Sequence, residues 1–147
     1  MATRCVALAL LILTSSPVAS TQRECAYCKM ILYAKEFGGE IETTSGEVLV
    51  FDAVECIAAS YYRSWNVPRS EVKAIRFVDY RKPEVSIPSS KATLLKTKSV
   101  RSPMGLNVVA LSSRAAAKKM KKSPEDEILT WNECVELVRT HWKLPAP

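Results

Sequence analysis

The chain has 147 residues, of which 48% are hydrophobic and 24% are charged, and its net charge is +6. This length and composition fit one globular domain or two very small ones, and beyond the N-terminus no apolar stretch reaches the length of about 18 residues that an internal transmembrane helix needs. The densest basic run, residues 118–122, has no interleaved aromatic residues and belongs to no DNA-binding motif, so we interpret it as a solvated helix face and expect no nucleic-acid partner.

The first twenty residues have the three parts of a secretory signal peptide. Arg4 supplies a positive charge, residues 5–13 are apolar, and the segment ends on small residues at Val18-Ala19-Ser20. We expect cleavage after Ser20 and a periplasmic or secreted location; the start of a buried helix is the alternative. Gln22-Arg23-Glu24 is not a lipoprotein context for Cys25, so a soluble exported chain is favoured over a lipid-anchored one.

Residues 21–84 are predicted to form a first ββαβ unit. Residues 37–44 and 47–51 are expected as strands joined by a two-residue turn, Ser45-Gly46. Asp52 stands where a helix N-cap belongs, and apolar residues recur at helical spacing behind it as far as Trp65. Residues 73–80 are expected as the third strand. Pro83 and Pro88 are interpreted as bracketing a break.

Residues 85–147 are predicted to repeat this order and to add a terminal helix. Strands are expected over residues 92–98, 106–111 and 128–131, with a helix over 114–122 that begins after Ser112-Ser113. Asn132 is expected to cap the last helix, which ends near Trp142. The fold class expected is therefore α+β, with two small ββαβ units packed as one body and a C-terminal helix.

The most informative string in the sequence is Cys25-Ala-Tyr-Cys28-Lys-Met30. It places two thiols and a thioether within six residues. Zinc usually takes four ligands from two separated pairs, whereas thiolate and thioether together select Cu(I). We therefore expect Cu(I) binding, and two alternatives stay open: a thiol–disulfide oxidoreductase that uses Cys25 and Cys28, and a structural disulfide.

A second string, Ser102-Pro103-Met104-Gly105, precedes a predicted strand. Proline and glycine fix a tight turn with Met104 between them, so this methionine is either held toward a ligand or partner or fills a gap in the core. Catalytic carboxylate pairs, Ser/His/Asp sets and phosphate-binding glycine loops are not visible in the sequence, and a non-enzymatic protein is expected.

In their order and spacing these strings resemble the NosL family of nitrous oxide reductase accessory proteins. The resemblance covers residues 25–135. It is carried by the motifs Cys25-Ala-Tyr-Cys28-Lys-Met30, Gly39-Glu-Ile-Glu-Thr-Thr-Ser-Gly46, Val50-Phe51-Asp52, Ser102-Pro-Met-Gly105, Leu106-Asn-Val-Val-Ala-Leu111 and Ile128-Leu-Thr-Trp131. It implies a pair of ββαβ units, Cu(I) binding, and delivery of copper to a periplasmic copper enzyme such as nitrous oxide reductase or to a copper-transport assembly.

The resemblance also implies a ligand set. Cys28 and Met30 match the family's Cys-x-Met, Met104 matches its Pro-Met-Gly, and Cys25 matches the Cys-x-x-Cys form of the motif. Lys29 departs from the family, which usually has glycine there. The expected metal ligands are therefore Cys25, Cys28, Met30 and Met104.

Three other candidate ligands are expected to have structural roles. Cys56 and Cys134 each lie early in a predicted helix, and we expect them to be buried thiols or to form a bridge joining the two units. His141, the only histidine, is far in sequence from the sulfur-rich string and is expected to be a surface or packing residue.

Overall fold

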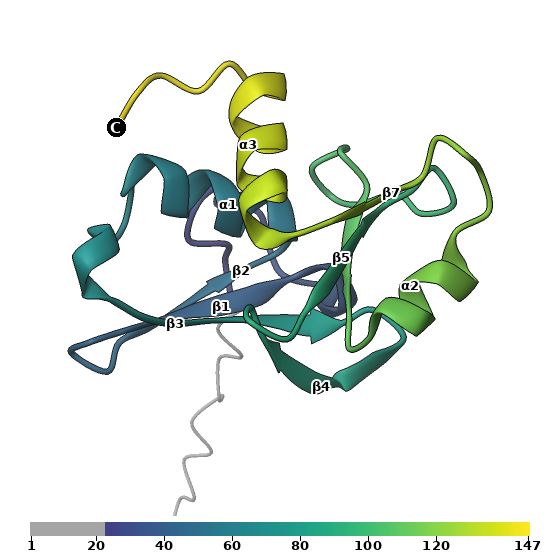
Figure 1. Cartoon of the computed structure of the whole chain (residues 1–147). Coiled ribbons are helices and arrows are strands. Elements are labelled where there is room, and N and C mark those ends of the chain that lie inside the picture. The colour runs from purple at the N-terminus through teal and green to yellow at the C-terminus, as the bar shows by residue number, and fades with distance from the viewer. Residues whose placement is uncertain (1–22) are drawn as a thin grey trace, which may run out of the picture.

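The computed structural model describes residues 23–147, so the predicted signal peptide and its cleavage site lie outside the described residues. Residues 23–147 form two antiparallel sheets and three α-helices, which confirms the predicted α+β class (Figure 1). Among the described residues, none of the helices has the length and apolar character needed to cross a membrane.

The first sheet has four strands in the order β2-β1-β3-β4. They are β1 (Gly39–Thr43), β2 (Val48–Phe51), β3 (Val72–Asp79) and β4 (Lys82–Pro88). Side chains alternate between the two faces, as in β3, where Ile75 and Phe77 are buried and Arg76 on the other face pairs with Glu42 at 2.8 Å. One face of this sheet therefore forms core, and the other carries ion pairs.

Strand β4 was not expected, because its two prolines were interpreted as a break. The strand pairs only with β3, at the edge of the sheet, where a residue that cannot donate a hydrogen bond is tolerated. The first unit is thus ββαββ, and the predicted boundary at residue 84 falls inside β4.

The turn between β1 and β2 also differs from the expected two-residue form. The amide of Thr43 donates to the carbonyl of Glu47 at 2.9 Å, which closes a three-residue loop over residues 44–46. Gly46 has φ of 90°, the left-handed conformation that the last position of such a loop requires and that glycine adopts without steric cost.

The second sheet has three strands in the order β6-β5-β7, formed by β5 (Thr93–Lys96), β6 (Val108–Leu111) and β7 (Glu127–Leu129). In both units the first strand is central and is flanked by the second and third. Helix α2 (Arg114–Met120) joins β6 to β7, as α1 (Val54–Arg63) joins β2 to β3. The predicted repetition of strand order is therefore present in the topology.

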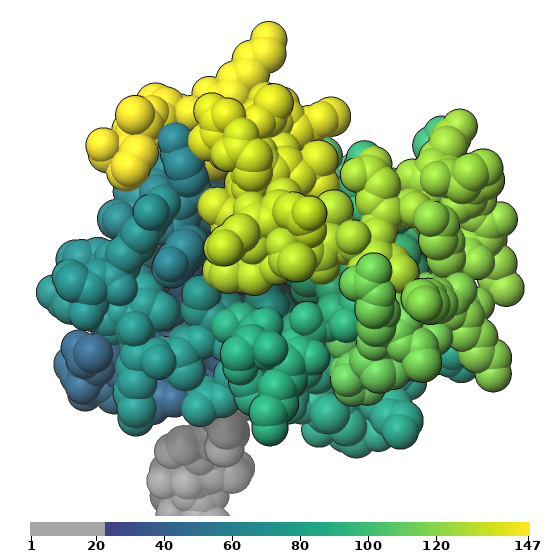
Figure 2. All heavy atoms as spheres, viewed as in Figure 1, coloured from purple at the N-terminus to yellow at the C-terminus, as the bar shows by residue number. Residues whose placement is uncertain are grey.

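Helices α1 and α3 (Trp131–His141) pack against each other over the core face of the first sheet, while α2 lies against the second sheet (Figure 1). In Figure 2 the C-terminal residues lie directly over the α1 region. Because α1 contacts β1, β2, β6 and α3, every residue from 51 to 60 is buried. The start of α1 is thus the most enclosed part of the molecule, and it adjoins the sulfur-rich loop.

Two predicted helix caps are wrong. Ala53, not Asp52, occupies the N-cap of α1, and no side-chain hydrogen bond caps that end. Thr130, not Asn132, caps α3 through a capping box in which its hydroxyl accepts from the amide of Glu133 and the Glu133 carboxylate accepts from the Thr130 amide. Ser113 caps α2 as expected.

Candidate metal centre

The sulfur-rich string forms a closed loop at the edge of β2. The amide of Cys25 donates to the carbonyl of Met30 at 2.8 Å, and the amide of Lys29 donates to the carbonyl of Cys25 at 3.1 Å. The amide of Ala26 donates to the carbonyl of Val50 at 2.8 Å, which fastens the loop to the first sheet. The Cys-x-x-Cys pair is therefore held by the backbone before any metal binds.

Lys29 has φ of 64°, a left-handed conformation that L-residues other than glycine seldom adopt. Its ammonium group bonds back to the carbonyl of Ala26 at 2.9 Å. Cys28 and Met30 are thus separated by a tight turn. The backbone at position 29 has the conformation that glycine adopts most easily.

The second contribution to the site comes from the end of β2 and the first turn of α1. Asp52 follows the last residue of β2, and Cys56 lies four residues later. The ligand atoms of Cys25, Cys28, Asp52 and Cys56 all lie within 4.8 Å of one another. All four described cysteines are free. Three thiols and one carboxylate thus form a cluster that could hold a metal ion.

Within the cluster the Asp52 carboxylate has one bonded and one unpartnered oxygen. The Cys28 thiol donates to Asp52 Oδ2 at 3.3 Å. Oδ1 is buried and has no hydrogen-bond partner among residues 23–147. A buried carboxylate oxygen without a partner is costly unless a positive charge or a donor faces it.

The electrostatics distinguish the three thiols. The neighbouring Cys56 thiol lowers the pKa of Cys25 to about 6, although burial acts in the opposite direction. Contact with Cys25, together with burial, raises the pKa of Cys56 well above its usual range. Burial raises the pKa of Cys28 to about 11. Among the three thiols, the surroundings thus favour the thiolate form most at Cys25.

The two predicted methionine ligands lie on the outer side of this region. Met30 is 38% exposed. Met104 is half-buried and packs against the hydrophobic cluster that contains Cys25 and Cys56. The structure therefore brings Cys25 and Cys28 together with Asp52 and Cys56, and it places Met30 in the same loop and Met104 against the adjoining core.

A buried carboxylate fixes the loop that carries Met104. The Ser102 hydroxyl donates to Glu55 Oε1 at 2.5 Å and accepts from the amides of Gly105 at 3.1 Å and Asn107 at 3.0 Å. Burial raises the pKa of Glu55, against the hydrogen bonds from Ser102 and Val108 that lower it. Glu55 precedes Cys56 in α1, so one helix turn contacts both the sulfur cluster and the methionine loop.

Cys134 and His141 lie outside the cluster. Cys134 is fully buried in α3, and burial raises the pKa of its thiol. His141 is exposed and lines a pocket of about 450 Å³ with Gly105, Asn107 and neighbouring polar residues. Cys134 and Cys56 are both buried free thiols, as one of the two expectations had it, and only Cys56 lies in the cluster with Cys25 and Cys28.

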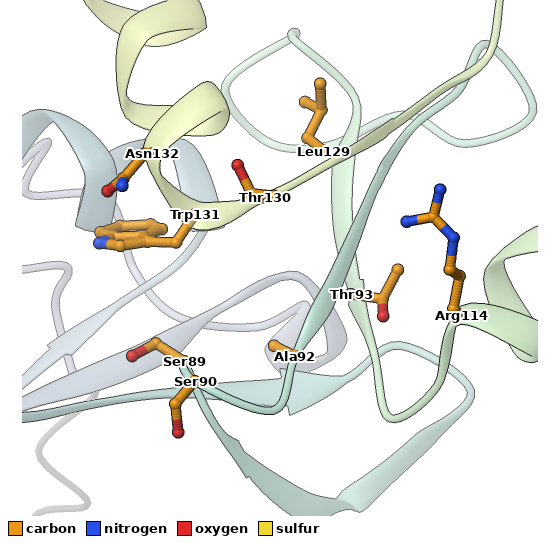
Figure 3. A pocket seen from close by; sticks show the side chains of 9 residues that line it. All are labelled: Ser89, Ser90, Ala92, Thr93, Arg114, Leu129, Thr130, Trp131 and Asn132. Atoms are coloured by element: carbon orange, nitrogen blue, oxygen red, sulfur yellow. The ribbon is translucent and has the colours of Figure 1, made fainter.

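A separate pocket of about 410 Å³ opens within the second unit, beside β5 and the start of α3 (Figure 3). Arg114 and Thr93 line one side, and Trp131 and Asn132, at the start of α3, line the other. Its lining contains no cysteine or methionine. This pocket therefore offers no soft ligands, and the sulfur cluster is the candidate metal centre.

Comparison with known proteins places the chain in a family. The family model NosL matches residues 17–136. The fold is similar to the crystal structure of the copper chaperone NosL from Shewanella denitrificans, with a TM-score of 0.64 and 18% identity over 81% of this chain and 93% of that chain. A search of curated proteins found no match. The chain belongs to the NosL family.

Proposed function

We propose that this protein is an exported, non-enzymatic metallochaperone that binds Cu(I) and passes it to a periplasmic copper enzyme such as nitrous oxide reductase. The observation that carries the proposal is that Cys25 and Cys28 lie within 4.8 Å of each other in one backbone-closed loop with Met30, in a fold shared with a copper chaperone. Thiolate and thioether sulfurs favour Cu(I) over harder divalent ions. The proposed ligands are Cys25, Cys28, Met30 and Met104.

The position of these ligands suits transfer as well as binding. Cys28 is half-buried and Met30 is 38% exposed, so a partner protein can approach the outer part of the site. Cys25 is fully buried. The ligands thus range from buried to exposed. A metal bound to them can leave by stepwise exchange of ligands with a recipient protein, which delivery requires.

The alternative function, thiol–disulfide exchange by Cys25 and Cys28, has one observation in its favour, the lowered pKa of Cys25. The sulfur of an attacking thiolate must reach the disulfide of a substrate. Cys25 is 0% exposed, whereas the half-buried Cys28 has a raised pKa. The reactive form and the accessible position thus belong to different residues, which disfavours oxidoreductase activity.

The test begins with the full chain expressed in a bacterial host. Protein from the periplasmic fraction should begin at Thr21, and a cytoplasmic chain that retains Met1 would contradict export. The reduced protein is then titrated against a Cu(I) chelator, with zinc binding measured in parallel. One Cu(I) per chain and a preference for Cu(I) over zinc are expected.

Single variants assign the ligands in the same assay. Cys28→Ser should lower Cu(I) affinity more than Met30→Leu or Met104→Leu, because the thiolate carries more of the bond than a thioether. Affinity should fall with decreasing pH, since protons compete for the thiolates. If zinc binds more tightly than Cu(I), or if both methionine variants keep full affinity, the proposed site is wrong.

A further inference from the structure

The inner part of the cluster contains a thiol that the proposed ligand set leaves out. Cys56 is 0% exposed, and its sulfur lies within 4.8 Å of the sulfurs of Cys25 and Cys28. Three ligand sulfurs arranged around one ion with bonds of about 2.3 Å would lie about 4 Å apart. The three thiols are therefore already close to the spacing of a three-coordinate site.

The charge distribution around these thiols favours a cation at their centre. The Asp52 carboxylate belongs to the same cluster and is 5% exposed, and its Oδ1 has no partner among the described residues. A buried carboxylate oxygen without a partner, set among three thiol sulfurs, is unfavourable in a protein interior unless a positive ion or a hydrogen-bond donor faces it.

From these two observations we infer that Cys56 is a metal ligand, so that bound Cu(I) is shared between the outer position and an inner one formed by the sulfurs of Cys25, Cys28 and Cys56. This inference rests on the proposed function and adds an inner position to it. Each thiol that binds Cu(I) loses its proton to solvent, no electron is transferred, and Cu(I) stays Cu(I). Cys28 is common to the inner position and to the outer one that includes Met30 and Met104.

The two positions differ in exposure, which gives them different roles. Two of the three inner thiols, Cys25 and Cys56, are fully buried, so the inner position shields the ion from water and from competing ligands. Met30, at 38% exposure, is the ligand that an incoming donor or recipient can meet first. Cu(I) therefore enters and leaves by way of Cys28 and the methionines, and from this outer position it exchanges with the inner position of three thiolates.

The experiment compares two buried helical cysteines. Cys56→Ala and Cys134→Ala remove the same group from similarly enclosed positions in α1 and α3, and only the first lies in the cluster. Both reduced variants are checked for native circular dichroism and titrated with Cu(I) against a chelator. Cys56→Ala should weaken binding by roughly tenfold to a hundredfold, a loss that even an outer-shell substitution commonly causes, and Cys134→Ala should retain wild-type affinity.

X-ray absorption of the Cu(I)-loaded proteins supplies a readout that a folding defect would not produce. The wild type and Cys134→Ala should show three sulfur neighbours without a light-atom neighbour, and Cys56→Ala should show fewer thiolate sulfurs. Equal affinity and equal spectra for the two variants would overturn the inner site while leaving the proposed function intact. Absence of Cu(I) binding in the wild type would instead refute the proposed function. Zinc displacing Cu(I) from the wild type but not from Cys56→Ala would assign the inner site to zinc and contradict the inference.

Discussion

At the scale of single residues, position 29 has a lysine in a backbone conformation that glycine adopts more easily. The family resemblance places glycine there, and this chain has Lys29 with φ of 64°. The left-handed conformation costs an L-residue roughly 1–2 kcal/mol. Glycine avoids this strain, but it loses more conformational entropy on folding, so the net stability difference between lysine and glycine is smaller. The loop around the two cysteines therefore tolerates Lys29 at a modest cost.

We predict that Lys29→Gly leaves the free energy of unfolding unchanged or raises it by up to about 1 kcal/mol. Lys29→Val should lower it by more than 1 kcal/mol or so, because a β-branched side chain fits the left-handed region poorly. Chemical denaturation of the reduced protein measures both. A stabilising Lys29→Val would show that the left-handed turn is not present in solution.

The sequence around Asp52 and Cys56 does not reveal that both side chains lie in the sulfur cluster. Their four-residue spacing at a strand–helix junction brings them near each other, and this was the one sequence signal that could have assigned Cys56 to the site. Read alone, a cysteine early in an apolar helix is typical of a buried thiol. Cys134 and Cys56 are both buried free thiols, as that interpretation expects, but only Cys56 lies beside other thiols.

At the scale of elements, the first turn of α1 fixes the methionine loop. Glu55 accepts from the Ser102 hydroxyl and from the Val108 amide at 3.3 Å, and the same hydroxyl accepts from two loop amides. Gly105, with φ of 82°, completes the turn. The position of Met104 therefore depends on a network anchored next to Cys56.

We predict that Ser102→Ala destabilises the fold by about 1–3 kcal/mol, because it leaves buried donors and an acceptor without partners. It should also lower Cu(I) affinity by about as much as Met104→Leu does, since the loop that carries the methionine is released. Thermal unfolding and chelator competition measure the two effects. Ser99→Ala, at an exposed position before the loop, is the matched control and should change neither. Stability loss with unchanged affinity would separate the loop from the metal site.

At the scale of the whole molecule, the two sheets meet where β3 ends. The amide of Tyr80 donates to the carbonyl of Ala110 at 2.9 Å, and the amide of Ser112 donates to Asp79 Oδ2 at 3.0 Å. Asp79 Oδ1 accepts from the amide of Arg81 at 2.9 Å. One buried carboxylate thus links the β3–β4 turn to the end of β6 and joins the two units.

Because Asp79 ionises, the contribution of this link to the stability of the fold depends on pH. Burial raises the pKa of its carboxyl, but hydrogen bonds from Ser112, Arg81 and Lys82 outweigh burial and hold the pKa below its usual value. A carboxyl with a lowered pKa in the folded state stabilises the fold above its unfolded pKa, and that contribution is lost as pH falls through the folded pKa.

We predict that Asp79→Asn lowers the free energy of unfolding at neutral pH by about 1–3 kcal/mol, and that the gap to the wild type closes as pH falls below about 4. Denaturant titrations at several pH values measure this gap. Glu84→Gln, on the exposed face of β4, is the control and should behave like the wild type throughout. A gap that stays constant down to acidic pH would mean that the charge of Asp79 does not stabilise the joint.

The alternation and spacing of apolar residues were sufficient to predict six of the seven strands, the three helices and the α+β class, because these patterns reflect which face of each element is buried. Strand β4 was not predicted because it contains prolines, which are disfavoured in the interior strands of a sheet but tolerated in an edge strand. The sequence does not indicate which strand lies at the edge. The cap at Asn132 was misassigned because another polar residue, Thr130, lies two positions earlier and forms the capping box. The cap at Asp52 was misassigned by one residue because α1 begins after Ala53, whose side chain makes no capping hydrogen bond that a pattern could reveal.

The sequence by itself determined the soft character of the site, since two thiols and a thioether within six residues define a donor set wherever they lie. Only the tertiary structure decided which further groups join it. Cys56 and Asp52 reach the cluster because the amide of Ala26 bonds to β2 and so places the loop beside the start of α1. Contacts between residues distant in sequence depend on how loops and helices pack, and no local pattern records that packing.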